Sequence, residues 1–372
     1  MNAPIQKPGK SIADGKGRVF PCEGCGADLE FHIGQQELKC PFCGFQKQLE
    51  FAEDATIEER DFHAMLENLQ TWREDGHSQE TGQSEIHCSG CAGTVVFQGT
   101  LTSTTCPYCG APIQLDKVHD AEHRIPVDGV LPFLVERKVA QQRLTEWVTS
   151  RWFAPGEFTQ RGVEGKFNGV YLPFWTFDSL TFTRYSGERG DNYTITVGEG
   201  NERRTETHIR WVPASGAFQR VFDDVLILAS RGLPQWIIDR LDPWPLEKLV
   251  PFSQAMLAGF FARTYEKELE PGFQEAQQRM ETALQAEVVQ RIGGDHQRVQ
   301  DRQSRYDAIT FKHLLLPVWL LAYRYGDKSF QVAVNAATGE VQGERPYSWI
   351  KIAFAVLLGP IAAGVLVVLL NQ

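Results

Sequence analysis

Paired cysteines near the start of the sequence constrain this chain more than any other feature. The 8 cysteines all precede residue 110 and form four Cys-x2-Cys pairs, with 14 residues between the two pairs of each set: Cys22, Cys25, Cys40 and Cys43, then Cys88, Cys91, Cys106 and Cys109. Every cysteine of the first set recurs 66 positions later (88 − 22, 91 − 25, 106 − 40, 109 − 43), which indicates an internal duplication. Two residues between thiolates let one tight turn direct both sulfurs at one ion, and two such turns complete a tetrahedron. The spacing predicts two zinc ions (Zn2+), each bound by four thiolates.

The residues next to the cysteines support metal binding. Gly26, Gly44 and Gly110 directly follow the second cysteine of their pairs, where a sharp turn favours a positive φ. Four thiolates leave no position open for water, so we expect both ions to be structural. About 30 residues cannot bury enough surface to fold alone, so the metal would organise each module. Ligands shared between the modules are the alternative, and the short 14-residue loops favour closure within each module.

The charge distribution favours protein partners over nucleic acid. Lys and Arg number 37 against 47 Asp and Glu, a net charge of −10. Residues 20–50 carry a charge of −3, and residues 86–115 contain no Asp, Glu, Lys or Arg. A surface that tracks phosphates needs clustered cations. We therefore predict protein-binding ribbons, with a nucleic-acid-binding protein that uses the ribbons and a basic leader as the alternative.

The sequence predicts several units in one chain. They are a flexible basic leader (1–19), zinc ribbon 1 (20–50), an amphipathic helix and linker (51–84), zinc ribbon 2 (85–118), a cytoplasmic α+β domain (119–346) and a C-terminal transmembrane anchor (347–372). The predicted fold class is multidomain: two small β-rich four-cysteine ribbons, a larger α+β domain with β-hairpins and helices, and one transmembrane helix. Apolar periodicity predicts helices over 53–74, 137–153, 251–269 and 272–292, helical pieces within 235–249, a strand over 125–135, and no regular element over 293–306.

A second internal similarity lies in the predicted α+β domain. Leu172-Pro173-Phe174-Trp175 and Leu316-Pro317-Val318-Trp319 share a Leu-Pro-x-Trp pattern at an offset of 144 (316 − 172). Each copy is expected to enter a β-hairpin, with Trp175 and Trp319 as core residues. A shared ligand groove is the alternative.

No catalytic or cofactor-binding residue is predicted. Gly9-Lys10-Ser11 matches the end of a nucleotide-binding loop, but Pro4 stands where that loop begins with Gly. The sequence also contains no recognisable motif that pairs a catalytic nucleophile with a base. We therefore expect a protein that is not an enzyme.

The last residues predict a membrane anchor. Ile352–Leu370 comprises 19 residues without a charge, about 28 Å as a helix, which matches the thickness of a bilayer core. A buried core helix is the alternative. Arg345 and Lys351 precede the segment, so the positive-inside rule places the bulk of the chain in the cytoplasm. The prediction is a single-pass protein of the inner (cytoplasmic) membrane, with the lipid bilayer as one partner.

The combination of these features resembles a known family. Cys-Pro-x-Cys-Gly turns, the Leu-Pro-x-Trp segments, Val334-Asn335-Ala336-Ala337-Thr338-Gly339-Glu340 and the apolar end together resemble bacterial membrane proteins with TFIIB-type zinc ribbons. Many of those are catalogued as primosomal protein N-prime or superfamily II helicase, an activity that would need the complete nucleotide-binding loop. The family is similar to companions of SPFH (stomatin/flotillin-like) and phage-shock proteins. The resemblance implies a scaffold that recruits such proteins to a membrane.

Overall fold

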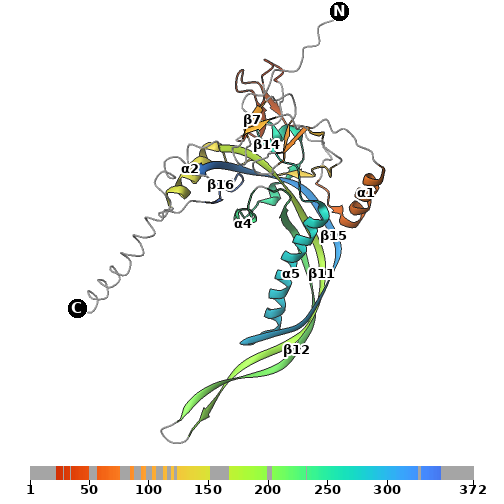
Figure 1. Cartoon of the computed structure of the whole chain (residues 1–372), viewed down its shortest axis with the longest axis vertical. Coiled ribbons are helices and arrows are strands. Elements are labelled where there is room, and N and C mark those ends of the chain that lie inside the picture. The colour runs from red at the N-terminus through yellow and green to blue at the C-terminus, as the bar shows by residue number, and fades with distance from the viewer. Residues whose placement is uncertain are drawn as a thin grey trace, which may run out of the picture.

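Three very long strands dominate the molecule. The computed structural model describes residues 22–27, 29–33, 35–49, 57–75, 84–87, 94–97, 103–105, 112–114, 119–120, 124–150, 167–198, 203–231, 233–325 and 328–344. The long strands are β11 (Phe167–Val197), β12 (Arg204–Leu228) and β15 (His296–Tyr325). At about 3.3 Å per residue, a strand of this length approaches 100 Å. Figure 1 shows that the three strands curve together into an arm, which we define as residues 178–224 and 296–310.

The long strands are part of one large curled sheet. The strand order is β12-β11-β15-β10-β13, with β10 at Gly129–Val130 and β13 at Val250–Pro251. Four further short strands extend this sheet. Strands β4 (Arg60–Asp61) and β16 (Lys328–Asn335) both pair with β15. Strand β14 (Phe261–Ala262) pairs with β11, and β17 (Val341–Gly343) pairs with β16. The long strands pair with one another antiparallel over almost their whole length. A single sheet therefore extends from the body of the molecule into the arm.

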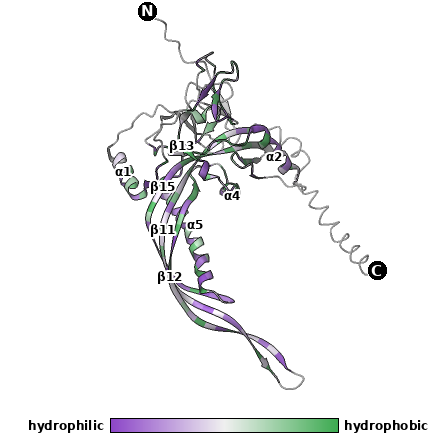
Figure 2. Ribbon diagram, turned by 180° about the vertical axis from the view of Figure 1, so that it is seen from behind, coloured by the Kyte–Doolittle hydropathy of each residue, from purple (hydrophilic) through white to green (hydrophobic). Residues whose placement is uncertain are grey.

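Helix α5 (Leu269–Ile292) covers the inner side of the curve (Figure 1). Every fourth residue of this helix is buried. These residues form one row along the helix: Gly272, Ala276, Met280, Leu284, Val288 and Ile292. The row packs in one core cluster with Trp175, Phe177 and Phe218 of the sheet. A Cβ at position 272 would lie 2.8 Å from Cδ1 of Trp175, so only glycine lets the helix approach the sheet this closely. Hydrophilic and hydrophobic residues both occur along the arm to its end (Figure 2).

The remaining helices are short. They are α1 (Phe62–Asp75), α2 (Arg137–Thr149), α4 (Gln235–Asp239) and the 3-10 helices η3 (Leu246–Lys248) and η4 (Gln254–Leu257). The helical pieces predicted within 235–249 are confirmed, and the helices predicted over 137–153 and 272–292 are observed over 137–149 and 269–292. The helix predicted over 53–74 begins only at Phe62. Trp175 and Trp319 are core residues as predicted, with 0% and 5% of their surface exposed.

Three predicted elements are wrong. Residues 251–269 form β13, η4 and β14 instead of a helix, because this segment hydrogen-bonds and packs between the cysteine-rich segment and the sheet. Residues 125–135 contain only the short strand β10. Residues 296–306 belong to β15, because the partner strand β11 pairs with this polar stretch on both sides of one irregularity in register, between Ser186 and Gly187.

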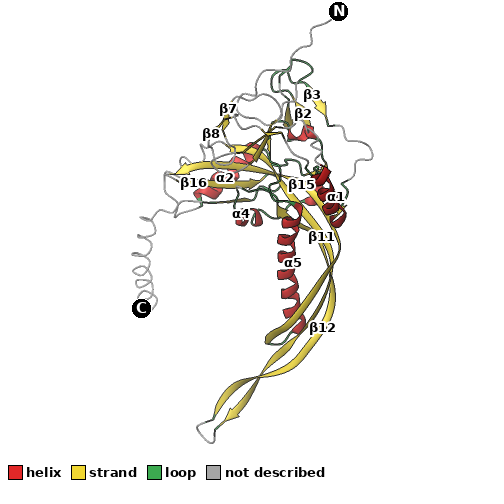
Figure 3. Cartoon of the chain, turned by 45° about the vertical axis from the view of Figure 1, so that its right-hand side comes forward, coloured by secondary structure: helices red, strands yellow, loops and turns green. Residues whose placement is uncertain are grey.

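Short antiparallel strands make up the cysteine-rich region. β1 (Glu30–His32), β2 (Glu37–Lys39) and β3 (Gln46–Gln48) form one small sheet. The later strands are β5 (Ser84–His87), β6 (Thr94–Phe97), β7 (Ser103–Thr105), β8 (Pro112–Gln114) and β9 (His119–Asp120). In Figure 3, β2, β3, β7 and β8 lie at the end of the molecule opposite the free end of β12.

The predicted fold class and cellular location need correction. Among the described residues, no helix combines the length and the apolar character that crossing a bilayer requires. The longest, α5, carries partly exposed charged side chains such as Glu275, Arg279 and Glu287, which form ion pairs. The structure describes a four-cysteine cluster and a large curled β-sheet domain. The lack of a membrane-crossing helix in this part of the chain contradicts two predictions, the fold class with a transmembrane helix and the single-pass inner-membrane protein. The predicted anchor, residues 347–372, lies outside the described residues.

Candidate metal centre

Two turns of matching backbone geometry bring the first four cysteines together. In each turn, the first cysteine takes part in two backbone hydrogen bonds. Its N–H donates to the carbonyl of the residue five positions later, and its own carbonyl accepts from the N–H of the glycine four positions later. These hydrogen bonds join Cys22 to Ala27 (2.6 Å) and Gly26 (2.8 Å), and Cys40 to Phe45 (2.8 Å) and Gly44 (3.1 Å). Gly26 and Gly44 have φ values of 74° and 75°, which confirms why glycine follows each pair.

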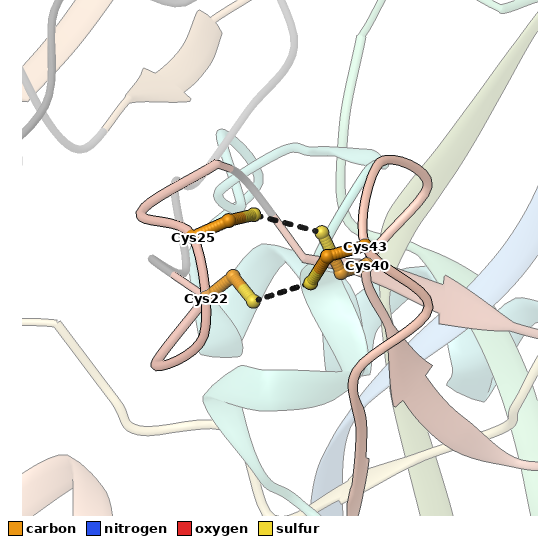
Figure 4. Close-up of side chains that lie close together, drawn as sticks. All are labelled: Cys22, Cys25, Cys40 and Cys43. Atoms are coloured by element: carbon orange, nitrogen blue, oxygen red, sulfur yellow. Dashed lines mark hydrogen bonds between the residues drawn. The ribbon is translucent and has the colours of Figure 1, made fainter.

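The four sulfurs have the spacing of a metal site. Sγ of Cys22 lies 3.5 Å from Sγ of Cys43, and Sγ of Cys25 lies 3.5 Å from Sγ of Cys40 (Figure 4). All four sulfurs lie within 4.8 Å of one another, and none of these cysteines is in a disulfide. A tetrahedral zinc ion with Zn–S bonds of about 2.3 Å requires S–S distances of about 3.8 Å. The cluster therefore fits zinc, as the sequence predicts for this set.

Metal binding at this cluster competes with protonation of the free thiols. The backbone N–H of Cys43 lowers the pKa of the Cys40 thiol to about 6. The backbone N–H of Ala27 lowers the pKa of Cys25, but hydrogen bonds with the sulfurs of Cys40 and Cys43 outweigh it and raise this pKa to about 12. Four neighbouring thiols thus do not ionise together at neutral pH. A divalent ion replaces their protons, so metal binding should weaken as the pH falls.

One side of the cluster belongs to the main core. Cys22 and Cys40 are buried, whereas Cys25 and Cys43 are exposed. The buried pair lies in a core cluster with Phe31, Phe260 and Trp319. The N–H of Phe31 in β1 also donates to the carbonyl of Ala258 (3.1 Å). Ribbon 1 is therefore packed onto the sheet domain and is not an independent domain on a linker.

The opposite side of the cluster carries an exposed aromatic ring. Phe42 lies between Cys40 and Cys43 and has 81% of its surface exposed. In the same ribbon, Nζ of Lys47 lies 2.8 Å from Oε1 of Glu23, an ion pair that links the first cysteine turn to β3. The exposed face of ribbon 1 thus combines one large apolar side chain with neutralised charges.

The second set of cysteines, Cys88, Cys91, Cys106 and Cys109, lies outside the described residues, so a second metal site is not shown. The strands that flank these cysteines are described. His87 of β5 pairs with Thr94 of β6, and Thr105 of β7 pairs with Pro112 of β8. In the sequence, each Cys-x2-Cys pair of the second set stands between two strands that pair antiparallel.

A second group of ionisable side chains lies where the arm meets the body. The carboxylates of Asp178, Asp223 and Asp224 lie within 4.8 Å of one another. Nζ of Lys312 lies 2.8 Å from Asp224 Oδ1, 3.6 Å from Asp178 Oδ2 and 3.1 Å from Glu59 Oε1. Burial raises the pKa of Asp178. The Lys312 ammonium thus already pairs with two of these three carboxylates.

Sequence reasoning missed this charged group because its members come from distant segments. Asp178 lies at an irregularity in β11, and Asp224 has a φ of 51° in β12. The adjacent Asp223 and Asp224 are the signal in the sequence that points to this group. His313, which follows Lys312 in β15, is buried, and burial lowers its pKa to about 4.

The comparisons with known proteins leave the function open. No family model matches the chain, and no solved structure matches it. The chain is 27% identical over 341 residues to a Bacillus subtilis (strain 168) protein that carries the name YdjG and is described as uncharacterized. The similarity covers 90% of this chain and 92% of the relative. It therefore spans both the cysteine-rich region and the sheet domain.

Proposed function

We propose that this chain is a non-enzymatic, zinc-stabilised adaptor that recruits protein partners. The observation that carries the proposal is the two-sided structure of ribbon 1. Its inner side, with Cys22 and Cys40, is part of the main core, and its outer side exposes Phe42. Four thiolates complete the coordination of zinc, so the ion would hold the fold and leave no site for a substrate.

Hairpin register supports a second zinc ion bound by Cys88, Cys91, Cys106 and Cys109. Lys39 of β2 pairs with Gln46 of β3, seven residues later (46 − 39), and Cys40 and Cys43 lie between them. The two hairpins of the second set repeat this register: paired residues are again seven apart (94 − 87 and 112 − 105), with cysteines at the first and fourth loop positions. A loop of the same length, register and cysteine positions is expected to direct its thiolates in the same way.

The exposed aromatic ring is the part of ribbon 1 best suited to a protein partner. Aromatic side chains dominate the binding energy of interfaces when they enter a pocket of the partner. Ribbon 2 has Tyr108 at the position that corresponds to Phe42 (108 − 42 = 66), so both turns carry an aromatic residue after proline. The SPFH and phage-shock proteins that the resemblance implies are the first partners to test.

Metal analysis tests the zinc part of this proposal. We expect two zinc ions per purified chain, and one ion in Cys40→Ser and in Cys106→Ser. One ion in the parent chain, lost completely in Cys40→Ser and retained in Cys106→Ser, would refute the second site. Two ions lost together in either variant would indicate ligands shared between the modules.

A direct binding assay tests the adaptor part. Purified chain is titrated with SPFH and phage-shock proteins from the same genome, and separately with DNA and RNA at several salt concentrations. We expect protein binding that weakens at least tenfold in Phe42→Ala and is unchanged in Val221→Ala, a matched control whose side chain on the arm is 70% exposed. Zinc content must stay at the parent value in both variants. Salt-dependent nucleic-acid binding without protein binding would refute the adaptor proposal.

A further inference from the structure

The arm has an open strand edge near its end. His296 at the start of β15 pairs with Gly190 of β11, but β11 continues for seven more residues (197 − 190), Asp191–Val197. These residues pair with β12 on one side. On their other side, no strand of the described part of the chain is present. The space that β15 would fill beside them is thus an unpaired sheet edge.

Hydrogen bonds establish which residues face this edge. The N–H of Asn192 donates to Oδ2 of Asp295 (2.7 Å), directly before β15, so the N–H of Asn192 points away from β12. Successive residues of a strand present their N–H and C=O groups to alternate sides. Thr194 and Thr196 therefore also direct their backbone N–H and C=O groups toward the open edge.

The outer edge of β12 carries a proline three residues beyond the segment that pairs with Asp191–Val197. Pro213 of β12 pairs with Glu188, and by the same alternation its nitrogen lies on the outer side of β12. Proline at an edge prevents pairing with a further strand. Residues 191–197 read Asp-Asn-Tyr-Thr-Ile-Thr-Val, without Pro, Gly, Lys or Arg. Tyr, Thr, Ile and Val favour strands, so this edge is suited to accept one.

We propose that this open edge pairs with the same edge of a second copy of the chain. Antiparallel pairing about a two-fold axis at Thr194 places Tyr193 of one copy opposite Ile195 of the other, and the two Thr194 residues opposite each other. Pairs of an aromatic with a β-branched residue, and of two threonines, are favourable across strands. Asp191 meets Val197, so the carboxylates do not face one another. The edge is self-complementary, as a two-fold interface requires.

This register also uses the free backbone groups. The two Thr194 residues exchange N–H···O=C hydrogen bonds across the axis, and each Thr196 N–H donates to the carbonyl of Asn192 in the other copy. The N–H of Asn192 needs no further acceptor because it already bonds to Asp295. The two hairpins then form a four-stranded sheet. The contact is small, so the association should be weak and concentration-dependent.

Two proline variants of matched geometry test the proposal. Thr194 pairs with Thr207 of β12, and the N–H groups of this pair point to opposite outer edges of the hairpin. Thr194→Pro and Thr207→Pro each remove one outward N–H and leave the ladder between β11 and β12 intact. In sedimentation experiments on the full chain, we expect dimers that dissociate at least tenfold more readily in Thr194→Pro, with Thr207→Pro like the parent. A parent chain that is monomeric throughout, or equal loss in both variants, would overturn the proposal.

Cross-linking tests the register even if a proline variant fails to fold. In the proposed dimer the two residues at position 194 lie about 5.5 Å apart between Cα atoms. Those at position 196 are displaced by four residues and lie roughly 14 Å apart. A short thiol cross-linker should join Thr194→Cys, but not Thr196→Cys, above the background of the zinc-loaded parent chain. Equal yields at both positions would contradict this interface. Because the edge lies far from the metal centre (Figure 3), its failure would leave the proposed function untouched.

Discussion

The cysteine-rich end and the arm depend on different physical forces. The strands of ribbon 1 are only three residues long and β3 is fully exposed, so only a few buried side chains, such as Phe31 and Leu38, support them. Strand β11, which runs from the body into the arm, has more than twenty paired residues on each side, and the helix α5 adds a continuous buried row. The whole ribbon should therefore unfold when one metal ligand is lost. In the arm, each substitution should instead reduce the stability only by the contacts that the replaced side chain made.

Loss of one metal ligand should give the largest effect. Cys40→Ser removes a buried thiolate of the cluster, and binding energies of structural zinc sites predict destabilisation on the order of 5 kcal/mol or more. Because Cys40 shares a core cluster with Phe260 and Trp319, urea unfolding should show the loss in the sheet domain too. Phe42→Ala is the control and should keep its zinc. Full metal content with unchanged protease resistance in Cys40→Ser would show that ribbon 1 does not depend on its metal ligands.

A cavity under α5 should cost less than a lost ligand. Leu284 is fully buried between the helix and the sheet, so Leu284→Ala should destabilise the protein by about 2–5 kcal/mol. The variant should retain the zinc content of the parent, which metal analysis can establish alongside thermal unfolding. Loss of zinc in this variant would show that the two ends are coupled more tightly than their separate cores indicate.

Gly272→Ala sets helix propensity against packing. Alanine favours a helix by about 1 kcal/mol over glycine. The added Cβ would lie 2.8 Å from Cδ1 of the buried Trp175, and overpacking of this kind typically costs about 1–3 kcal/mol. We expect net destabilisation in a denaturant titration. A more stable Gly272→Ala would show that α5 can move away from the sheet at little cost.

The smallest effect concerns the charged group at the base of the arm. The hydrogen bond with Lys312 lowers the pKa of Glu59 below its ordinary value of 4.5. Its stabilisation is therefore present above that value and is lost as the pH falls through the lowered folded-state pKa. Glu59→Gln should destabilise the chain by less than about 1 kcal/mol at neutral pH, because Glu59 is half exposed. The difference from the parent should vanish in acid, and Glu58→Gln serves as the neighbouring control. A difference that persists at low pH would exclude the ion pair as its cause.

Local signals in the sequence were sufficient for some features. The Cys-x2-Cys pairs with following glycines predict the turns of ribbon 1, because the ligand positions and the positive φ are properties of a few adjacent residues. The four-residue spacing of Ala276, Met280 and Leu284 likewise identifies α5. Trp175 and Trp319 are core residues as expected from their hydrophobic segments.

Other features arise only from contacts between distant segments. Residues 296–306 have no sustained apolar pattern, and they form a strand because β11 pairs with them and because Glu281 of α5 interacts with Arg302 and Tyr306. The docking of ribbon 1 on the sheet and the group around Lys312 likewise join residues that are far apart in sequence.

The amino-acid sequence by itself determined the metal-binding turns, the buried row of α5 and the two core tryptophans, since neighbouring residues encode turn geometry and helical periodicity. The tertiary structure decided where the ribbon docks, how far β15 extends and that one edge of the arm stays open. Strand pairing satisfies backbone groups whatever the side chains are, so the identity of the partner strand, and not local composition, decides where a ladder begins and ends.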